Sequence, residues 1–246
     1  GRVEHTLMEG LERIRFVVLD KSLGWRGYLR VRRDLANDRF PVLLHMHASA
    51  RANLASLTVS APIRLGFDRV RARDFQYYFC NHHLPARAQQ HVMDGLFEFA
   101  AALGVARGKP RWEIPLSDVD RELAARILPA ATPSLIISPC TGARFRNYRN
   151  WRAERYAAIA DYAHARYGAT VLLTGGTTAL EREYGEAITA TSKYKAENLI
   201  GKTSLQQLLA LITRASVGVC PDSGPAHMAT AVRTPMPRQR GTSARR

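Results

Sequence analysis

The second half of the chain alternates short apolar runs with amphipathic stretches, and this alternation limits the possible folds more than any other feature. Residues 156–167 carry apolar side chains at helical spacing, and Gly168 follows at the position where helices commonly end. A further helix is expected to begin at Thr203 or Ser204. Short apolar runs predict strands at 135–138, 170–173, 199–200 and 217–220. Strands that alternate with helices in this way form a parallel sheet covered on both faces. The sequence therefore predicts an α/β fold of the Rossmann-like type.

The first half of the chain shows the same alternation less regularly. Strands are expected at 16–19 and 42–46, and helices at 28–35, 50–60, 89–103 and 119–128. Glycine and proline interrupt the pattern between 106 and 133, so we place the domain boundary there. The expected organisation is a first domain at 1–130, a second at 131–236 and a disordered basic tail at 237–246, with no further strand in that tail.

Composition favours a protein of a reducing compartment and leaves two interpretations of the basic charge open. The net charge is +15, and most of the surplus is arginine spread along the chain. This surplus can reflect genome base composition as easily as attraction to polyanions. The three cysteines form no CxxC pair, which argues against a disulfide framework or a thiolate metal site. The chain contains no apolar run of membrane-spanning length.

Three loops of the second half are suited to an anion. In a doubly wound parallel sheet, ligands bind beyond the carboxyl ends of the strands. The loop after the strand at 135–138 combines small residues, which let backbone amides approach a ligand, with arginines as charge-assisted donors: Thr141, Gly142, Arg144 and Arg149. A solvated basic loop is the alternative interpretation.

The two later loops have related chemistry. Gly175 and Gly176 permit close approach of a nucleotide, and Glu181 supplies a carboxylate for ribose hydroxyls, although a plain tight turn explains the glycines equally well. The last loop brings a helix N-terminus, and therefore outward amides and a positive dipole end, next to polar side chains: Asp222, Ser223, Gly224 and His227. Pro225 is expected at the first helical position. A surface histidine is the alternative for His227.

These segments, taken in order, resemble the ADP-heptose:lipopolysaccharide heptosyltransferase family (glycosyltransferase family 9). The element D-S-G-P-x-H at 222–227, preceded by G-x-T-S-L at 201–205, is the most specific part. The resemblance extends over about residues 16–235 and is looser in the first half.

The resemblance implies a glycosyltransferase of the GT-B type, built from two Rossmann-like domains with the N-terminal domain incomplete. Such an enzyme transfers heptose from ADP-heptose to the lipopolysaccharide inner core, with inversion and without a metal or cofactor. Its first domain binds the lipid A/core oligosaccharide acceptor. The expected location is cytoplasmic, in peripheral contact with the cytosolic face of the inner membrane.

The resemblance also suggests roles within the donor site. It assigns diphosphate contacts to Thr141, Gly224 and His227. Arg149 stands where the family has a lysine before tryptophan, Glu181 resembles the ribose-binding carboxylate, and Asp222 resembles the carboxylate that holds sugar hydroxyls.

The chain departs from the family pattern at both ends. The family opens with a glycine–aspartate loop whose aspartate is the expected base, and this sequence starts after that loop, so no catalytic residue is assigned. Two alternatives therefore stay open. One is a catalytically inactive fragment of the family, and the other is a basic nucleic-acid-binding module, which the charge of +15 suggests.

Overall fold

The chain forms two compact units. The structure is a computed structural model, and it describes residues 2–12, 14–87, 90–141 and 150–239. Unit 1 comprises Gly1–His5 and Glu12–Pro110, and unit 2 comprises Thr6–Leu11 and Arg111–Arg246. Among the described residues, no helix is long and apolar enough to cross a membrane.

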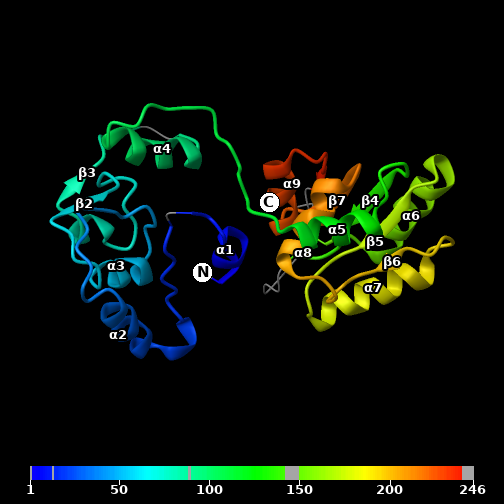
Figure 1. The fold of residues 1–246 in the computed structure, drawn as a ribbon, viewed down its shortest axis with the longest axis horizontal. Helices are drawn as coiled ribbons and strands as arrows, with labels where there is room; N and C mark the ends of the chain where they lie inside the picture. The colour runs from blue at the N-terminus through cyan, green and yellow to red at the C-terminus, as the bar shows by residue number, and fades with distance from the viewer. Residues whose placement is uncertain (1, 13, 88–89, 142–149, 240–246) are drawn as a thin grey trace, which may run out of the picture. The chain divides into compact units, whose positions relative to one another are not determined.

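Unit 2 contains a parallel sheet with the strand order β6-β5-β4-β7-β8. Its strands are β4 (Ser134–Ile137), β5 (Thr170–Leu173), β6 (Glu197–Asn198), β7 (Val217–Pro221) and β8 (Arg238–Gln239). Its helices are α5 (Asp118–Ile127), α6 (Ala153–Tyr167), α7 (Ala179–Thr191), α8 (Leu205–Arg214) and α9 (Gly224–Val232) (Figure 1). The predicted α/β fold with a parallel sheet is confirmed.

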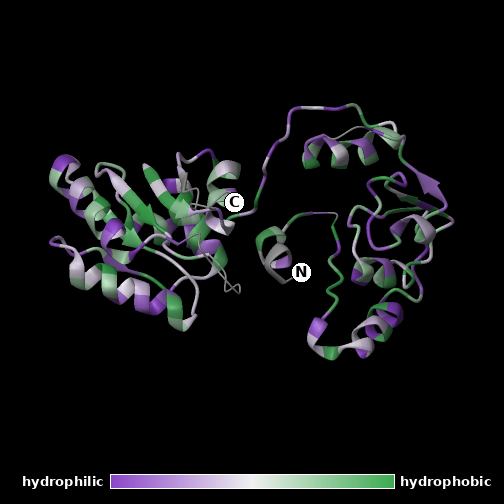
Figure 2. Cartoon of the chain, turned by 180° about the vertical axis from the view of Figure 1, so that it is seen from behind, coloured by the Kyte–Doolittle hydropathy of each residue, from purple (hydrophilic) through white to green (hydrophobic). Residues whose placement is uncertain are grey.

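Both faces of this sheet are buried, as the continuous apolar strands require. Leu135 and Ile137 of β4 pack in a cluster with Tyr156 of α6 and Ile188 of α7. Ile136, between them in sequence, points to the opposite face and packs with a second cluster, which contains side chains of α5, α8 and α9. Side chains alternate between the two faces of a strand, so a short apolar strand fills both cores at once. The central strands β4 and β5 are correspondingly green in Figure 2.

The helix ends follow local rules that the sequence carries. Gly168 ends α6 with φ of 62°, a conformation that glycine adopts without strain. Ser204 caps α8 through its side chain and forms a capping box with Gln207, so the predicted helix begins at the second of the two expected positions. Helix α7 lies outside the predicted elements, and its N-terminus carries the same type of box between Thr178 and Glu181.

The expected domain boundary at 130 differs from the division of the structure between residues 110 and 111. Helix α5, placed in the first domain by the sequence, belongs to unit 2. Ala124 and Leu128 are almost fully buried in the cluster formed by α8 and α9, and the Arg214 guanidinium donates to the Leu128 carbonyl. The break at 130–133 is therefore only the connection from α5 to β4, because the apolar face of α5 needs the cover that α8 provides.

The expectation of no strand in the C-terminal tail is also wrong. Strand β8 pairs in parallel with β7, with Cys220 opposite Arg238 and Pro221 opposite Gln239. The Gly218 amide donates to the Pro235 carbonyl at 2.9 Å. The backbone groups along the free side of β7 require partners, and the tail supplies them although it has little apolar surface. Residues 240–246 of the expected disordered tail lie outside the described residues.

Unit 1 contains a smaller parallel sheet in the order β1-β2-β3. Its strands are β1 (Val42–Leu44), β2 (Ile63–Gly66) and β3 (His82–His83), and its α-helices are α2 (Trp25–Asp34), α3 (Ala50–Ser56) and α4 (Val92–Ala102). Two 3-10 helices, η1 (Lys21–Leu23) and η2 (Gln76–Phe79), lie in loops, and α1 (Arg2–Met8) precedes them all. The strand expected at 16–19 does not form: this part of the described chain has no strand hydrogen-bonded to it, and a β-strand needs that neighbour.

The buried apolar cluster of unit 1 is small and is reinforced by charge. Leu65, Leu84 and Phe99 form the cluster. Beside it, the Arg71 guanidinium donates to Asp68 and, at 2.7 Å, to Glu98. Burial alone raises the pKa of Asp68, but hydrogen bonds from Arg71 and from the Val70 amide outweigh it, so the pKa lies below its usual value.

Candidate functional site

Three loops of unit 2 leave its sheet at one edge. Strands β5, β4 and β7 are neighbours in that order and run parallel, so their carboxyl ends lie side by side. The segments that follow them begin at Ser138, Thr174 and Asp222. The sequence predicted this shared edge, and the topology confirms it.

Two hydroxyl side chains join the ends of β4 and β5. Ser138 Oγ and Thr174 Oγ1 lie 2.7 Å apart, and both residues are buried. Neither residue is among the predicted site residues. A small hydroxyl residue directly after each buried strand was the available signal, because a buried polar group at that place needs a partner.

The first loop is closed by a single amide side chain. The Thr141 amide donates to Asn150 Oδ1 at 3.0 Å, which links the residues on either side of 142–149. The Tyr156 hydroxyl donates to the Pro139 carbonyl at 2.9 Å and fixes the start of the loop on α6. Of the predicted donor-site residues, Thr141 is described and nearly buried. The others in this loop, Gly142, Arg144 and Arg149, lie outside the described residues.

Cys140, in the same loop, has a thiol of low reactivity. Burial, and then the negative charge of Glu181, raises the pKa of its thiol to about 12. The thiol is therefore protonated at neutral pH, and the thiolate is the reactive form. Cys140 is not set up as a nucleophile.

The second loop holds Glu181 by hydrogen bonds within the loop. Its carboxylate accepts from the Gly176 amide at 2.6 Å, from the Thr178 amide at 3.2 Å and from the Thr178 hydroxyl at 2.6 Å. A Cβ atom on Gly176 would lie 3.0 Å from Glu181 Oε2. The glycine therefore makes room for the capping carboxylate of α7. The spacing T-x-x-E at 178–181 is the signal that predicts this cap.

The third loop presents an open helix N-terminus. Ser223 occupies the N-cap position of α9, but its hydroxyl donates to the Pro221 carbonyl at 3.1 Å and does not cap the helix. No atom comes within 4 Å of a Cβ built on Gly224. Asp222 and His227 are exposed on either side of this turn. An anion that approaches here meets backbone amides at the positive end of the helix dipole.

The helix itself begins at Gly224, so Pro225 is its second residue and not its first, as the sequence analysis expected. The described residues contain no group of three or more histidine, cysteine or acidic side chains that could hold a metal ion.

Comparisons with known proteins agree with this arrangement. The profile of glycosyltransferase family 9 (heptosyltransferase) matches residues 28–236. The chain is 35% identical over 236 residues to the lipopolysaccharide core heptosyltransferase OpsX of Haemophilus influenzae, covering 96% of this chain and 67% of that protein.

Solved structures show the same fold. A family 9 glycosyl transferase from Veillonella parvula superposes with a TM-score of 0.80 at 21% identity, covering 96% of this chain and 68% of that one. The E. coli heptosyltransferase WaaC with ADP gives a TM-score of 0.72 at 18% identity, covering 96% of this chain and 73% of that one.

The fold, the shared loop edge and these comparisons define a glycosyltransferase. The chain belongs to glycosyltransferase family 9, the heptosyltransferase family.

Proposed function

We propose that this protein transfers heptose from ADP-heptose to the inner core of lipopolysaccharide, with inversion and without a metal. The observation that carries the proposal is the edge where the loops after β4, β5 and β7 meet beside the uncapped start of α9, in a member of this family. The OpsX relative is named as a lipopolysaccharide core heptosyltransferase, which supports the same acceptor class. Family membership also removes the reason to treat the basic charge as a sign of nucleic-acid binding.

Unit 2 would bind the donor and unit 1 the acceptor side. The diphosphate would lie against Thr141 and the amides of Gly142 and Gly224, with further contact from His227. Arg144 and Arg149 would neutralise the charge that grows on ADP as it leaves. Donors fixed in advance at a place where charge develops lower the barrier without reorganisation, which is electrostatic catalysis.

The carboxylates would select the sugars. Asp222, exposed next to Ser223 after β7, would accept from heptose hydroxyls. Glu181 uses three hydrogen bonds for its cap, and a carboxylate offers about four acceptor positions, so one stays for a ribose hydroxyl. Gly175 and Gly176 keep the backbone beside this carboxylate free of side chains.

Calorimetry with ADP tests the donor site. We expect the full chain to bind ADP, and Arg149→Ala to weaken ADP-heptose more than adenosine, because adenosine has no phosphate for the arginine to contact. Arg152→Ala, at the exposed N-cap of α6, is the matched control and should bind as the unchanged protein does. A folded protein that gives no binding heat with about 1 mM ADP contradicts the proposal.

The acceptor would be lipid A carrying core sugars, reached at the cytosolic face of the inner membrane through peripheral contact. The support is the acceptor class in the relative's name and the basic charge of the chain. Anionic lipids attract such charge without insertion of a helix.

A further inference from the structure

Helix α2 of unit 1 presents apolar side chains to solvent. Leu23, in the turn before the helix, is 39% exposed, Trp25 68% and Leu29 52%. Trp25 and Leu29 are four positions apart and therefore lie on one face, one turn from each other. Exposed side chains of this size add nothing to the core of unit 1.

The opposite face of the helix fixes this orientation. Gly27 and Val31 are its buried residues. A Cβ on Gly27 would lie only 2.7 Å from the Asp20 carbonyl oxygen, so the helix approaches the preceding segment closely at that point. Trp25 and Leu29 face outward because the other side of α2 is committed to packing.

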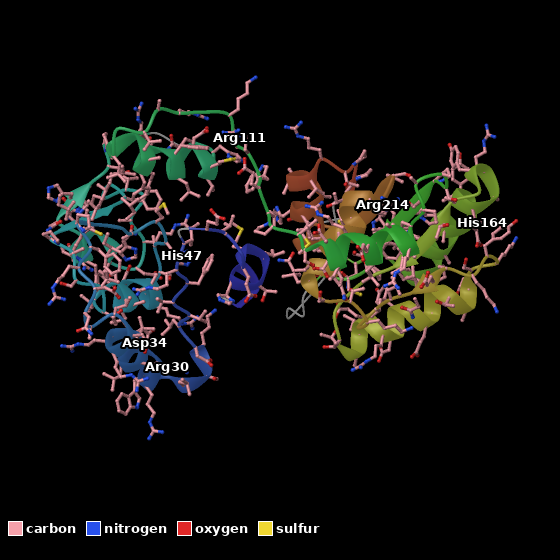
Figure 3. All side chains as sticks on the ribbon, viewed as in Figure 1. Arg30, Asp34, His47, Arg111, His164 and Arg214 are labelled. Atoms are coloured by element: carbon pink, nitrogen blue, oxygen red, sulfur yellow. The ribbon has the colours of Figure 1, made fainter. Side chains whose placement is uncertain are left out.

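Basic side chains flank the apolar pair, although Arg30 also lines a hollow with Phe16 and Asp20. Those of the turn and helix are all exposed: Lys21, Arg26, Arg30, Arg32 and Arg33. The Arg26 guanidinium lies 5.9 Å from the centre of the Trp25 ring. The acid of the helix, Asp34, makes only long ion pairs, 3.9 Å to Arg30 and 3.7 Å to Arg33. Figure 3 labels Arg30 and Asp34 on this helix.

We propose that the outer face of α2 docks on an anionic lipid bilayer. Trp25 and Leu29 would enter the headgroup–acyl boundary, where tryptophan is favoured, and the arginines would contact lipid phosphates. The inference rests on the proposed function, since a lipid-borne acceptor is the reason for the protein to stay at a membrane surface.

The combination of side chains favours a bilayer over a soluble anion. A phosphorylated sugar in water could engage the arginines, but it would leave Trp25 and Leu29 exposed. A bilayer surface can contact the arginines and the apolar pair together, because its phosphates lie directly above apolar acyl chains.

Flotation with vesicles tests the apolar part. The full chain should float with phosphatidylcholine vesicles that contain phosphatidylglycerol, and should not float with phosphatidylcholine alone. Trp25→Ala with Leu29→Ala should reduce the partition coefficient about tenfold or more. The matched control is Tyr162→Ala with Tyr167→Ala, an aromatic pair on α6 that is 62% and 58% exposed, and it should float as the unchanged protein does.

A second pair of variants tests the charge. Arg26→Gln with Arg33→Gln should reduce flotation. The vesicle binding that remains should be less sensitive to salt between about 0.05 and 0.5 M, because salt screens each arginine–phosphate contact and the variant has fewer of them. Arg166→Gln with Arg182→Gln removes the same charge from exposed positions of unit 2 and should change flotation far less.

Each contrary result has a definite meaning. Equal flotation of the Trp25/Leu29 variant and the unchanged protein overturns the docking, as does equal binding to neutral vesicles. Loss of binding in the arginine variant alone points to an ionic contact and also overturns it. ADP calorimetry separates the two proposals: a protein that binds ADP but not anionic vesicles contradicts only the docking, whereas vesicle binding without ADP binding contradicts only the donor site.

Discussion

Individual glycines at the sheet edge have different tasks, although they look alike in the sequence. Gly176 lies against the Glu181 carboxylate, whereas Gly224 borders open space. The sequence pattern predicts both as places where the backbone meets a ligand. The structure gives Gly176 a task within the fold, and the open surface at Gly224 is what a bound diphosphate would need.

Gly224→Ala should separate binding from stability. The new methyl group meets no atom, so the free energy of unfolding should stay the same or rise by up to about 1 kcal/mol. The methyl group would nevertheless occupy the proposed diphosphate position, so ADP affinity should fall about tenfold. Thermal unfolding and calorimetry on the same preparation check this, and unchanged ADP affinity speaks against a diphosphate at α9.

Gly176→Ala should lower stability, in contrast to Gly224→Ala. Its Cβ would crowd Glu181 Oε2 and loosen the cap of α7, which should lower the free energy of unfolding by about 1 kcal/mol. Urea unfolding measures the loss, with Gly224→Ala as the control. An unchanged unfolding midpoint would show that the carboxylate moves aside freely.

Cys140 should resist alkylation. A thiol pKa of about 12 leaves on the order of a thousandfold less thiolate than a free cysteine has at neutral pH. Mass spectrometry after treatment with iodoacetamide should find Cys140 unmodified in the folded protein and modified in urea. Rapid modification of the folded protein would mean that the loop opens often.

Elements were predictable from the sequence where the pattern is local. The period of residues 156–167 and the glycine after it predict α6, and the capping residues fix the start of α8. Helix α7 lies outside the predicted elements, although its capping box is plain in the sequence. The strand at 16–19 and the placement of α5 depended on partners far along the chain. Strand β8 depends on the needs of β7, which the tail's own composition does not reveal.

Leu128→Ala tests the placement of α5. The Leu128 side chain is almost fully buried inside unit 2, so its truncation should lower the free energy of unfolding by about 3 kcal/mol. Leu103→Ala, at the exposed end of α4, should change it little. Chemical denaturation monitored by circular dichroism gives both values. Equal effects would contradict the assignment of α5 to a buried position.

At the scale of the whole molecule, each of the two units is stabilised internally in a different way. Unit 2 has extensive apolar clusters on both faces of its sheet, whereas unit 1 combines a small cluster with the Arg71–Asp68–Glu98 pairing. The candidate site was predictable because it follows from strand order in unit 2. The parts of the site within 142–149 stay predictions from sequence alone.

Acid should therefore unfold unit 1 before unit 2. Because the pKa of Asp68 is lowered in the folded state, its contribution is complete above the unfolded value of about 3.9 and is lost as the pH falls through the folded value. Asp68→Asn should destabilise unit 1 by about 3 kcal/mol at neutral pH, and the difference from the unchanged protein should shrink in acid. Hydrogen exchange resolved by unit checks the order, and a single concerted acid transition would contradict it.

The pairing of β8 with β7 also decides where a label can be placed. Both strands run in the same direction, so the polypeptide exits the sheet after Gln239 on the side where Asp222 and the start of α9 lie. A purification tag or fluorophore inserted directly after Gln239 would therefore begin near the proposed diphosphate site. Binding measurements are best made on protein without a tag at this position.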